Sequence, residues 1–272
     1  MTHQESVPTL SLIGVGVMGE AILTSLIAAV GRSNVRVSDG RPSHGREVAA
    51  RHQVQWVESN LAAVAGCDVV VVAVKPQDFD VLADEIGPQL REGALVVSVA
   101  AGVTTARMIR HLGTHVHTVR VMPNTPATIG RGVCALSPGA GTGERELDLV
   151  AELLANTGRV EVVAEELQDT VTAISGSGPA YVFYLIEAMA AAGVEGGLEP
   201  DVALRLATQT VAGAAAMAAT SEQEPAELRA RVTSPGGTTA AALEEFEERG
   251  VAAGIIAGAR KAWERSKELG AG

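Results

Sequence analysis

Short apolar runs alternate with helical patterns over residues 9 to about 164, and this alternation then stops. Runs such as Asp68–Val74 and Ala94–Ala100 are apolar almost throughout, as strands covered on both faces must be. Strands joined by helices pack as a doubly wound parallel sheet, because their crossovers are right-handed. We therefore expect an α/β domain over residues 1–164. Its expected strands are Thr9–Val15, Val35–Ser38, Asp68–Val74, Ala94–Ala100, Thr118–Met122, Gly132–Leu136 and Arg159–Val163, and its expected helices are Met18–Ala29, Phe79–Leu90, Ala106–Leu112 and Glu144–Asn156.

After about residue 165 the patterns are helical only, so we expect an all-α domain over residues 165–272. The helix Pro200–Thr220 is apolar around much of its circumference, and such a helix must be buried. A domain of this size can hardly cover it alone, which predicts dimerisation through this half of the chain. The expected helices are Pro179–Ala192, Pro200–Thr220, Pro225–Arg231, Thr239–Arg249 and Val251–Leu269.

The composition of the 272 residues excludes several classes of protein. Lys and Arg number 21 and Asp and Glu 32, so the net charge is −11, and only 3% of the residues are aromatic. Such a chain lacks the basic surface and the stacking platforms of nucleic-acid binders, and it lacks a basic face for membranes. Cys67 and Cys134 stand too far apart for a disulfide framework or a metal site.

Targeting and membrane signals are also missing from the sequence. Met1–Pro8 has no apolar core of a signal peptide, and the longest apolar stretches are interrupted by charges such as Asp68 and Arg205. We expect a soluble, cytoplasmic protein with no nucleic-acid or membrane partner.

A glycine-rich segment predicts a dinucleotide site. Gly14, Val15, Gly16, Val17, Met18 and Gly19 follow the first strand and open the first helix. Gly14 allows the tight turn, Gly16 lets the backbone approach a pyrophosphate, and Gly19 lets helix and strand pack closely. The pyrophosphate would accept hydrogen bonds from free N–H groups at the helix start. The alternative is a tight strand-to-helix turn with no ligand.

The end of the second strand bears on the choice of cofactor. Asp39 lies 20 positions after Gly19, where a carboxylate can bind the ribose 2′-hydroxyl of NADH. Ser38 and Arg41 favour NADPH instead, because an Arg nearby can bind its 2′-phosphate. Arg41 is equally compatible with a solvated turn. The residues leave NADPH and NADH both open.

Three further strand ends should line the same crevice, because open α/β sheets bind ligands at the carboxyl ends of their strands. Lys75 is left there when Pro76 ends the fourth strand, although taken alone it is better explained as a lysine at an exposed strand end. Small residues end the fifth strand and leave room for a nicotinamide ring. The candidate residues are Ala73, Val74, Lys75 and Pro76 after the fourth strand, Ala100 and Ala101 after the fifth, and Asn124 after the sixth.

Two glycine-rich turns precede helices in the second half. They are Ser175–Tyr181 (SGSGPAY) and Thr233–Thr239 (TSPGGTT). Each presents free N–H groups, hydroxyls and a helix dipole to an anion, although ordinary helix capping has the same composition. Two such turns in one domain favour a carboxylate-binding function.

Together these motifs resemble those of the pyrroline-5-carboxylate reductase family, from Leu10 to about Leu269. The resemblance rests on GVGVMG, AVKPQ, SVAAG, RVMPNTP, SGSGPAY and TSPGGTT in this order. It implies a Rossmann-like N-terminal domain, a helical C-terminal domain, and a homodimer that assembles further into a decamer in many members. It also implies roles for Lys75 beside the nicotinamide, Asn60 near the adenosine, and Glu165, Ser234, Gly237, Thr238 and Thr239 at the substrate. The family often has Asn-Arg after the second strand, where this chain has Asp39-Gly40.

The implied reaction moves a hydride from NADPH or NADH to C5 of 1-pyrroline-5-carboxylate and gives L-proline, the last step of proline biosynthesis. A protonated imine is already electrophilic, so the protein supplies mainly orientation. We expect the Thr239 hydroxyl to bond the ring nitrogen. The six histidines show no motif and are interpreted as surface or loop residues, and no metal is expected.

Three alternatives to this reaction stay open. One is another imine reductase, and the second is a β-hydroxyacid dehydrogenase-like enzyme. The latter would carry a catalytic Lys in its long helix, which Pro179–Ala192 lacks. The third is a nucleotide-sensing protein without turnover.

Overall fold

The computed structural model describes residues 7–270, and contacts between residues divide them into two compact units. The first runs up to Gly176 and resumes at Trp263, and the second is Ser177–Ala262. The first unit thus takes in residues 165–176 and the end of the chain, which the sequence analysis assigned to the second domain. Gln168 shows why, because its buried side chain donates to Ala135 O at 3.1 Å and to Ser137 Oγ at 2.7 Å.

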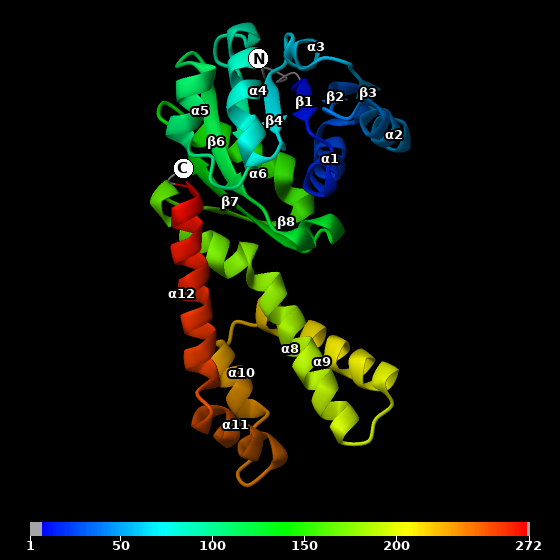
Figure 1. Ribbon diagram of the computed structural model, residues 1–272, viewed down its shortest axis with the longest axis vertical. Helices are drawn as coiled ribbons and strands as arrows, with labels where there is room; N and C mark the ends of the chain where they lie inside the picture. The colour runs from blue at the N-terminus through cyan, green and yellow to red at the C-terminus, as the bar shows by residue number, and fades with distance from the viewer. Residues whose placement is uncertain (1–6, 271–272) are drawn as a thin grey trace, which may run out of the picture. The chain divides into compact units, whose positions relative to one another are not determined.

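The first unit is built on one twisted sheet (Figure 1). Within residues 7–270 its strand order is β3-β2-β1-β4-β5-β6-β7-β8. The strands from β3 to β6 are parallel, and Leu12 in the centre pairs with Val37 on one side and Val71 on the other. The strands are β1 Leu10–Ile13, β2 Val35–Ser38, β3 Gln55–Trp56, β4 Val69–Val72, β5 Leu95–Ser98, β6 His117–Met122, β7 Gly132–Pro138 and β8 Gly158–Val162.

The doubly wound α/β class is confirmed, but the expectation of a wholly parallel sheet is wrong. Strand β7 runs antiparallel to β6, and β8 is parallel to β7. The connection from β6 to β7 contains only the short turn η4, Thr125–Ile129. A parallel strand needs a crossover of a dozen or more residues, so this connection can only return the chain antiparallel.

Helices cover both faces of the sheet, as Figure 1 shows. One core contains Ile22, Leu23 and Leu26 from α1, and the other contains Phe79 and Ile86 from α4. Helices α2 and α6 share the first core with α1, while α3 and α5 share the second with α4. The helices are α1 Val17–Val30, α2 Pro42–His52, α3 Asn60–Val64, α4 Phe79–Ile86, α5 Thr105–Leu112, α6 Glu144–Leu154 and α7 Gln168–Val171.

The second unit is entirely helical over the residues described. Its best-packed pair is α8 and α9, in which a Cβ on Gly193 would lie 3.0 Å from the Cβ of Ala203. This close approach is why Gly and Ala are frequent here. Its helices are α8 Gly178–Glu195, α9 Pro200–Thr220, α10 Pro225–Arg231, α11 Thr238–Glu248 and the first part of α12, Val251–Gly270.

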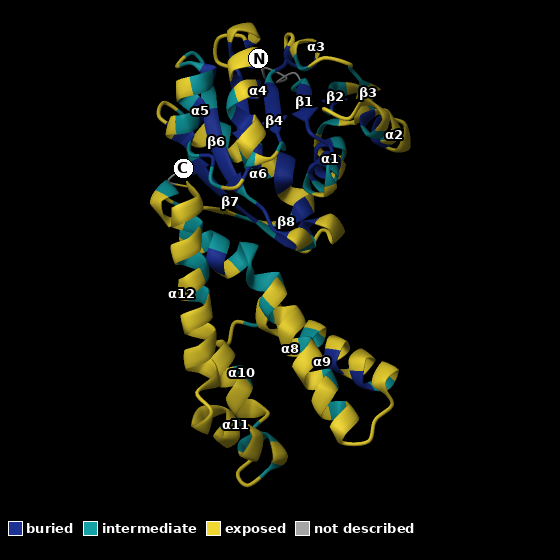
Figure 2. Ribbon diagram, in the orientation of Figure 1, coloured by how far each residue is buried: buried dark blue, intermediate teal, exposed yellow. Residues whose placement is uncertain are grey.

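Helix α9 leaves most of its apolar surface uncovered (Figure 2). Among its described residues only Ala203 and Ala207 are buried. By length and composition alone, α9 is long and apolar enough to cross a membrane. Asp201 and Arg205 both lie near its start, so Arg205 does not interrupt most of this apolar helix.

Candidate functional site

The glycine-rich loop lies between β1 and α1, at the carboxyl edge of the parallel strands. Gly14 has a φ of +93°, and a Cβ on Gly19 would lie 2.1 Å from the Gly14 carbonyl oxygen. Both positions therefore require glycine. At Gly16, by contrast, no heavy atom of the described chain lies within 4 Å of the place that a Cβ would take.

The start of α1 fits a phosphate group. Gly16 is the N-cap, and no side chain of the described residues caps this helix. The first N–H groups of a helix have no acceptor within the helix, and its dipole is positive at this end. The open space beside Gly16 lets an anion reach these N–H groups. This arrangement fits the pyrophosphate of a dinucleotide.

The predicted adenosine-side residues lie together beside this loop. Gly14 N donates to Ser38 O at 2.8 Å, which joins the loop to the end of β2. The Ser38 hydroxyl donates to Asn60 Oδ1 at 3.0 Å, and Asn60 Nδ2 donates to Glu85 Oε2 at 3.1 Å. The structure thus brings together Ser38 and Asn60, which lie 22 positions apart in the sequence.

Asp39 makes its hydrogen bonds to the protein itself. Its Oδ2 accepts from Val15 N at 2.8 Å, and its Oδ1 accepts from Arg41 N at 2.8 Å and Arg41 Nε at 3.2 Å. Burial raises the pKa of the Asp39 carboxyl, but these donors outweigh burial and hold that pKa below its ordinary value. The side chain of Arg41 is 64% exposed, whereas that of Asp39 is 7% exposed.

The ends of β4 and β5 lie next to the glycine-rich loop. A Cβ on Gly14 would lie 2.7 Å from Ala73 O, and Ala73 N donates to Ile13 O at 2.8 Å. Lys75, the residue before Pro76, is exposed, as predicted from the sequence. Residues 73–76 after β4 and residues 100–101 after β5 therefore border the same edge of the sheet as Gly16.

Asn124 fixes the loop after β6 from within. Its Nδ2 donates to Ser175 O at 3.1 Å, and its Oδ1 accepts from Val133 N at 2.9 Å. The side chain thus ties β6 to β7 and to the segment that leads into the second unit.

Glu165 is anchored in the first unit. Its carboxylate accepts from Thr105 N at 2.7 Å and from the Thr105 hydroxyl, and it lies 3.5 Å from Arg120 Nη1. Arg120 belongs to the RVMPNTP motif and is 6% exposed. The carboxylate therefore joins the start of α5 to β6.

The remaining predicted substrate residues belong to the second unit. Gly237 N donates to Ser234 O at 3.0 Å, and Gly236 has a φ of +67°, so the chain turns tightly before α11. Gly237 is the N-cap of α11, and no described side chain caps it. Thr238 and Thr239 form the first turn of the helix, and their hydroxyls form no hydrogen bond with the described residues.

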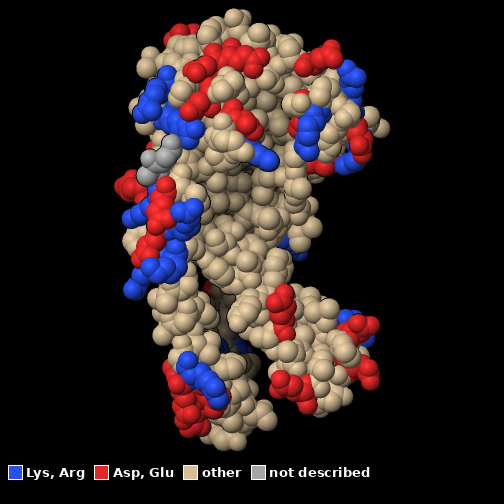
Figure 3. Space-filling model, viewed as in Figure 1, with Lys and Arg blue, Asp and Glu red and all other residues tan. Residues whose placement is uncertain are grey.

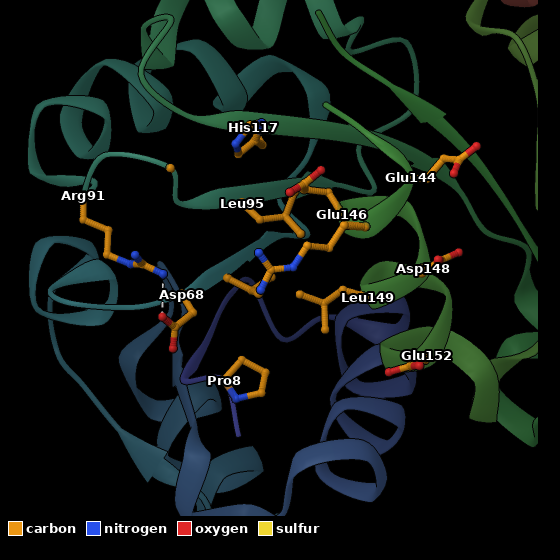
Figure 4. Close-up of a pocket in the computed structure, with 13 residues that line it drawn as sticks. Pro8, Asp68, Arg91, Leu95, His117, Glu144, Glu146, Asp148, Leu149 and Glu152 are labelled. Atoms are coloured by element: carbon orange, nitrogen blue, oxygen red, sulfur yellow. Dashed lines mark hydrogen bonds and ion pairs between the residues drawn. The ribbon is translucent and has the colours of Figure 1, made fainter. Parts of the chain in front are cut away.

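A cavity of about 890 Å³ lies elsewhere in the first unit (Figure 4). It is lined by Val69, Leu95 and His117, at or near the amino ends of β4, β5 and β6, and by the acidic face of α6. Ligands of open α/β sheets bind at the opposite edge, so this cavity is separate from the candidate site. Within residues 7–270 no group of three His, Cys, Asp or Glu side chains could hold a metal ion.

His44 was not predictable as part of the site. The sequence predicts a surface or loop residue, but the structure places His44 in the first turn of α2, half-buried, with Nε2 3.0 Å from Val15 O. The one sequence feature that could have placed His44 on a helix is Pro42, because proline is common at the first residue of a helix.

Comparisons with known proteins cover both halves of the chain. A family model described as pyrroline-5-carboxylate reductase dimerisation matches residues 165–269, and a model described as NADP oxidoreductase coenzyme F420-dependent matches residues 9–102. Pyrroline-5-carboxylate reductase of Pseudomonas aeruginosa is 41% identical over 266 residues, which cover 97% of this chain and 97% of that relative.

Solved structures match with similar coverage. A pyrroline-5-carboxylate reductase from Coxiella burnetii matches with a TM-score of 0.93 and 34% identity, over 97% of this chain and 99% of that chain. The Plasmodium falciparum pyrroline carboxylate reductase with NADP bound matches with a TM-score of 0.82 and 28% identity, over 97% of this chain and 98% of that chain. With such identity to relatives over nearly its whole length, this chain belongs to the pyrroline-5-carboxylate reductase family.

Proposed function

We propose that this protein is a pyrroline-5-carboxylate reductase that uses NADPH or NADH to reduce 1-pyrroline-5-carboxylate to L-proline. The observation that carries the proposal is the open, uncapped start of α1 beside Gly16, in a chain 41% identical to a pyrroline-5-carboxylate reductase. The NADP oxidoreductase match over residues 9–102 and the relative with NADP bound support NADPH as a cofactor.

The first unit would hold the cofactor. Gly16 and the N–H groups at the start of α1 would bind its pyrophosphate, and Ser38, Arg41 and Asn60 would surround its adenosine half. When bound, the reduced nicotinamide supplies the hydride. Lys75 and the small residues Ala100 and Ala101 would border the nicotinamide end of the site.

The turn before α11 would hold the substrate. The N–H groups of Thr238 and Thr239, which follow Gly237 at the start of α11, would bind the substrate carboxylate together with the Ser234 hydroxyl, because free N–H groups at a helix start attract anions. The Thr239 hydroxyl would bond the ring nitrogen and orient C5. Glu165, as the resemblance implies, would act at the substrate, and its bonds to Thr105 would hold its carboxylate in place.

The test is to measure oxidation of NADPH and of NADH in parallel when pyrroline-5-carboxylate is added, and to identify proline by chromatography. We expect turnover with this imine and none with a β-hydroxyacid and oxidised cofactor. Turnover of other cyclic imines alone would indicate a broader imine reductase, and binding without turnover would indicate a nucleotide sensor.

We also propose that the second unit forms a homodimer, which can assemble further, and that the protein is cytoplasmic. Exposed apolar side chains support the dimer, among them Phe183, Leu204 and Leu206, and Figure 3 shows broad uncharged areas on the helices of this unit. Such a surface marks an interface.

Light scattering on the full chain, purified without detergent, checks the dimer. We expect a mass of at least two chains, in the soluble fraction. Leu206→Glu, on exposed α9, should shift the mass toward one chain, whereas Arg205→Glu, one position earlier, should not. A stable, active monomer would refute the dimer, and recovery only with membranes would identify α9 as a span.

A further inference from the structure

The backbone of Val15, in the middle of the glycine-rich loop, is hydrogen-bonded through both its N–H and its carbonyl by residues of another segment. Its N–H donates to Asp39 Oδ2 at 2.8 Å, and its carbonyl oxygen lies 3.0 Å from His44 Nε2. The carbonyl can only accept, so Nε2 carries the proton in this bond. Both partners come from the segment between β2 and the first turn of α2.

The two peptide groups that flank the Val15 Cα would otherwise be poorly fixed. They join Val15 to Gly14 and to Gly16, and glycine loses more conformational freedom on folding than any other residue. The Val15 side chain is fully buried, which anchors the residue but does not set the orientation of the two peptide groups. Each hydrogen bond sets the orientation of one of them, and together they set the direction in which Gly16 leads into α1.

Asp39 is in turn held in place. It accepts three hydrogen bonds from Val15 and Arg41, and its side chain is 7% exposed. A carboxylate that recognises a ribose must offer an accessible oxygen, whereas most of the surface of this one is occupied by the protein.

We propose that Asp39 and His44 form a clamp on the backbone of Val15 and are positioning residues, which hold the loop in the shape that binds the pyrophosphate. The proposal rests on the cofactor binding of the proposed function. Because NADPH and NADH share the pyrophosphate, the clamp supports both equally. A ribose-binding Asp39 would instead separate them, since its loss would weaken NADH and favour NADPH.

The experiment measures binding of ADP, NADH and NADPH to the full chain by titration calorimetry, without substrate. ADP reports on the diphosphate without the nicotinamide. His44→Leu removes the donor to Val15 O, and His44→Gln retains an amide N–H near the same position. His111→Leu is the matched control, because it removes a histidine bonded to Asp84 on α4, which packs on the other face of the sheet.

We expect His44→Leu to weaken all three ligands by the same factor, roughly three- to tenfold, with most of the loss restored in His44→Gln. Asp39→Asn should weaken NADH and NADPH together, by roughly tenfold or more, because a charged acceptor is lost. His111→Leu should bind as the wild type. Thermal melting of each variant confirms that it is folded.

Three outcomes overturn the clamp. The first is unchanged affinity in folded His44→Leu, and the second is equal loss in His44→Leu and His44→Gln. The third is an Asp39→Asn protein that binds NADPH more tightly and NADH less tightly. In these cases the wild type still binds nucleotide and the proposed function stands. A wild type that binds no dinucleotide overturns the proposed function and the clamp with it.

Discussion

Gly19→Ala should destabilise the first unit strongly, whereas Gly16→Ala should leave it intact and abolish most cofactor binding. A Cβ at Gly19 would lie 2.1 Å from the Gly14 carbonyl oxygen and 3.0 Å from its carbon. Neither backbone atom can move without displacing the turn. We expect a cost of about 3 kcal/mol, and a melting temperature lower by roughly 5–10 °C.

Gly16→Ala should affect cofactor binding without affecting the stability of the protein. The φ of −67° and ψ of −170° at Gly16 suit alanine, and no described atom lies within 4 Å of the added methyl group. The melting temperature should therefore hold. The methyl group would occupy the space that the pyrophosphate needs, so affinity for NADPH should fall by about tenfold or more, which corresponds to 1.4 kcal/mol. Equal effects of the two substitutions on melting and on binding would contradict this division of roles.

Thr239→Val should lower turnover roughly ten- to a hundredfold and leave cofactor affinity nearly unchanged. Valine keeps the shape and removes the hydroxyl, and a hydrogen bond to a charged group contributes about 1.5–3 kcal/mol. In the structure Gly237, not Thr239, is the N-cap of α11, and the Thr239 hydroxyl has no partner among the residues described. Its loss should therefore not lower the melting temperature.

Two further variants sharpen the test at Thr239. Thr239→Ser keeps the hydroxyl and should restore most of the turnover. Thr220→Val is the matched control, because its hydroxyl donates to Ala216 O at 2.9 Å within α9, so its loss affects local stability rather than turnover. Normal turnover with a lowered melting temperature in Thr239→Val would show that this hydroxyl only stabilises its helix.

The fold was predictable where burial leaves a continuous pattern. Strands β4 and β5 are buried on both faces, and their apolar runs identified them to within two residues at each end. Helix α2 was missed because only Gly45, Val48 and Ala49 of its residues are buried, which leaves a weak apolar stripe. Strand β3 has only two residues, which is too short for an alternation of apolar and polar residues to be recognised. The direction of β7 depends on the length of the turn before it, and the pattern of apolar residues gives no information on that direction.

The site was predictable where its residues are close in sequence. The glycine-rich loop is one such segment, and its geometry follows from glycine at the positions that need it. Contacts between distant residues were not visible, such as His44 with Val15 or Glu165 with Thr105, which are 29 and 60 positions apart. For Asp39 the position beside the loop was foreseen, but its hydrogen bonds to Val15 and Arg41 were not.

The return of the chain to the first unit affects the order in which the protein can fold during synthesis. Every strand of the sheet precedes residue 163, yet the Ser266 hydroxyl donates to Asp169 Oδ1 at 2.7 Å, a contact that spans 97 positions. A ribosome releases the N-terminal segments first. The first unit therefore begins to fold before the second exists, but acquires its last contacts only after the whole helical unit has been translated. An N-terminal fragment that ends at Gly176 would lack those contacts, and supplying residues 263–270 as a covalent extension should restore them.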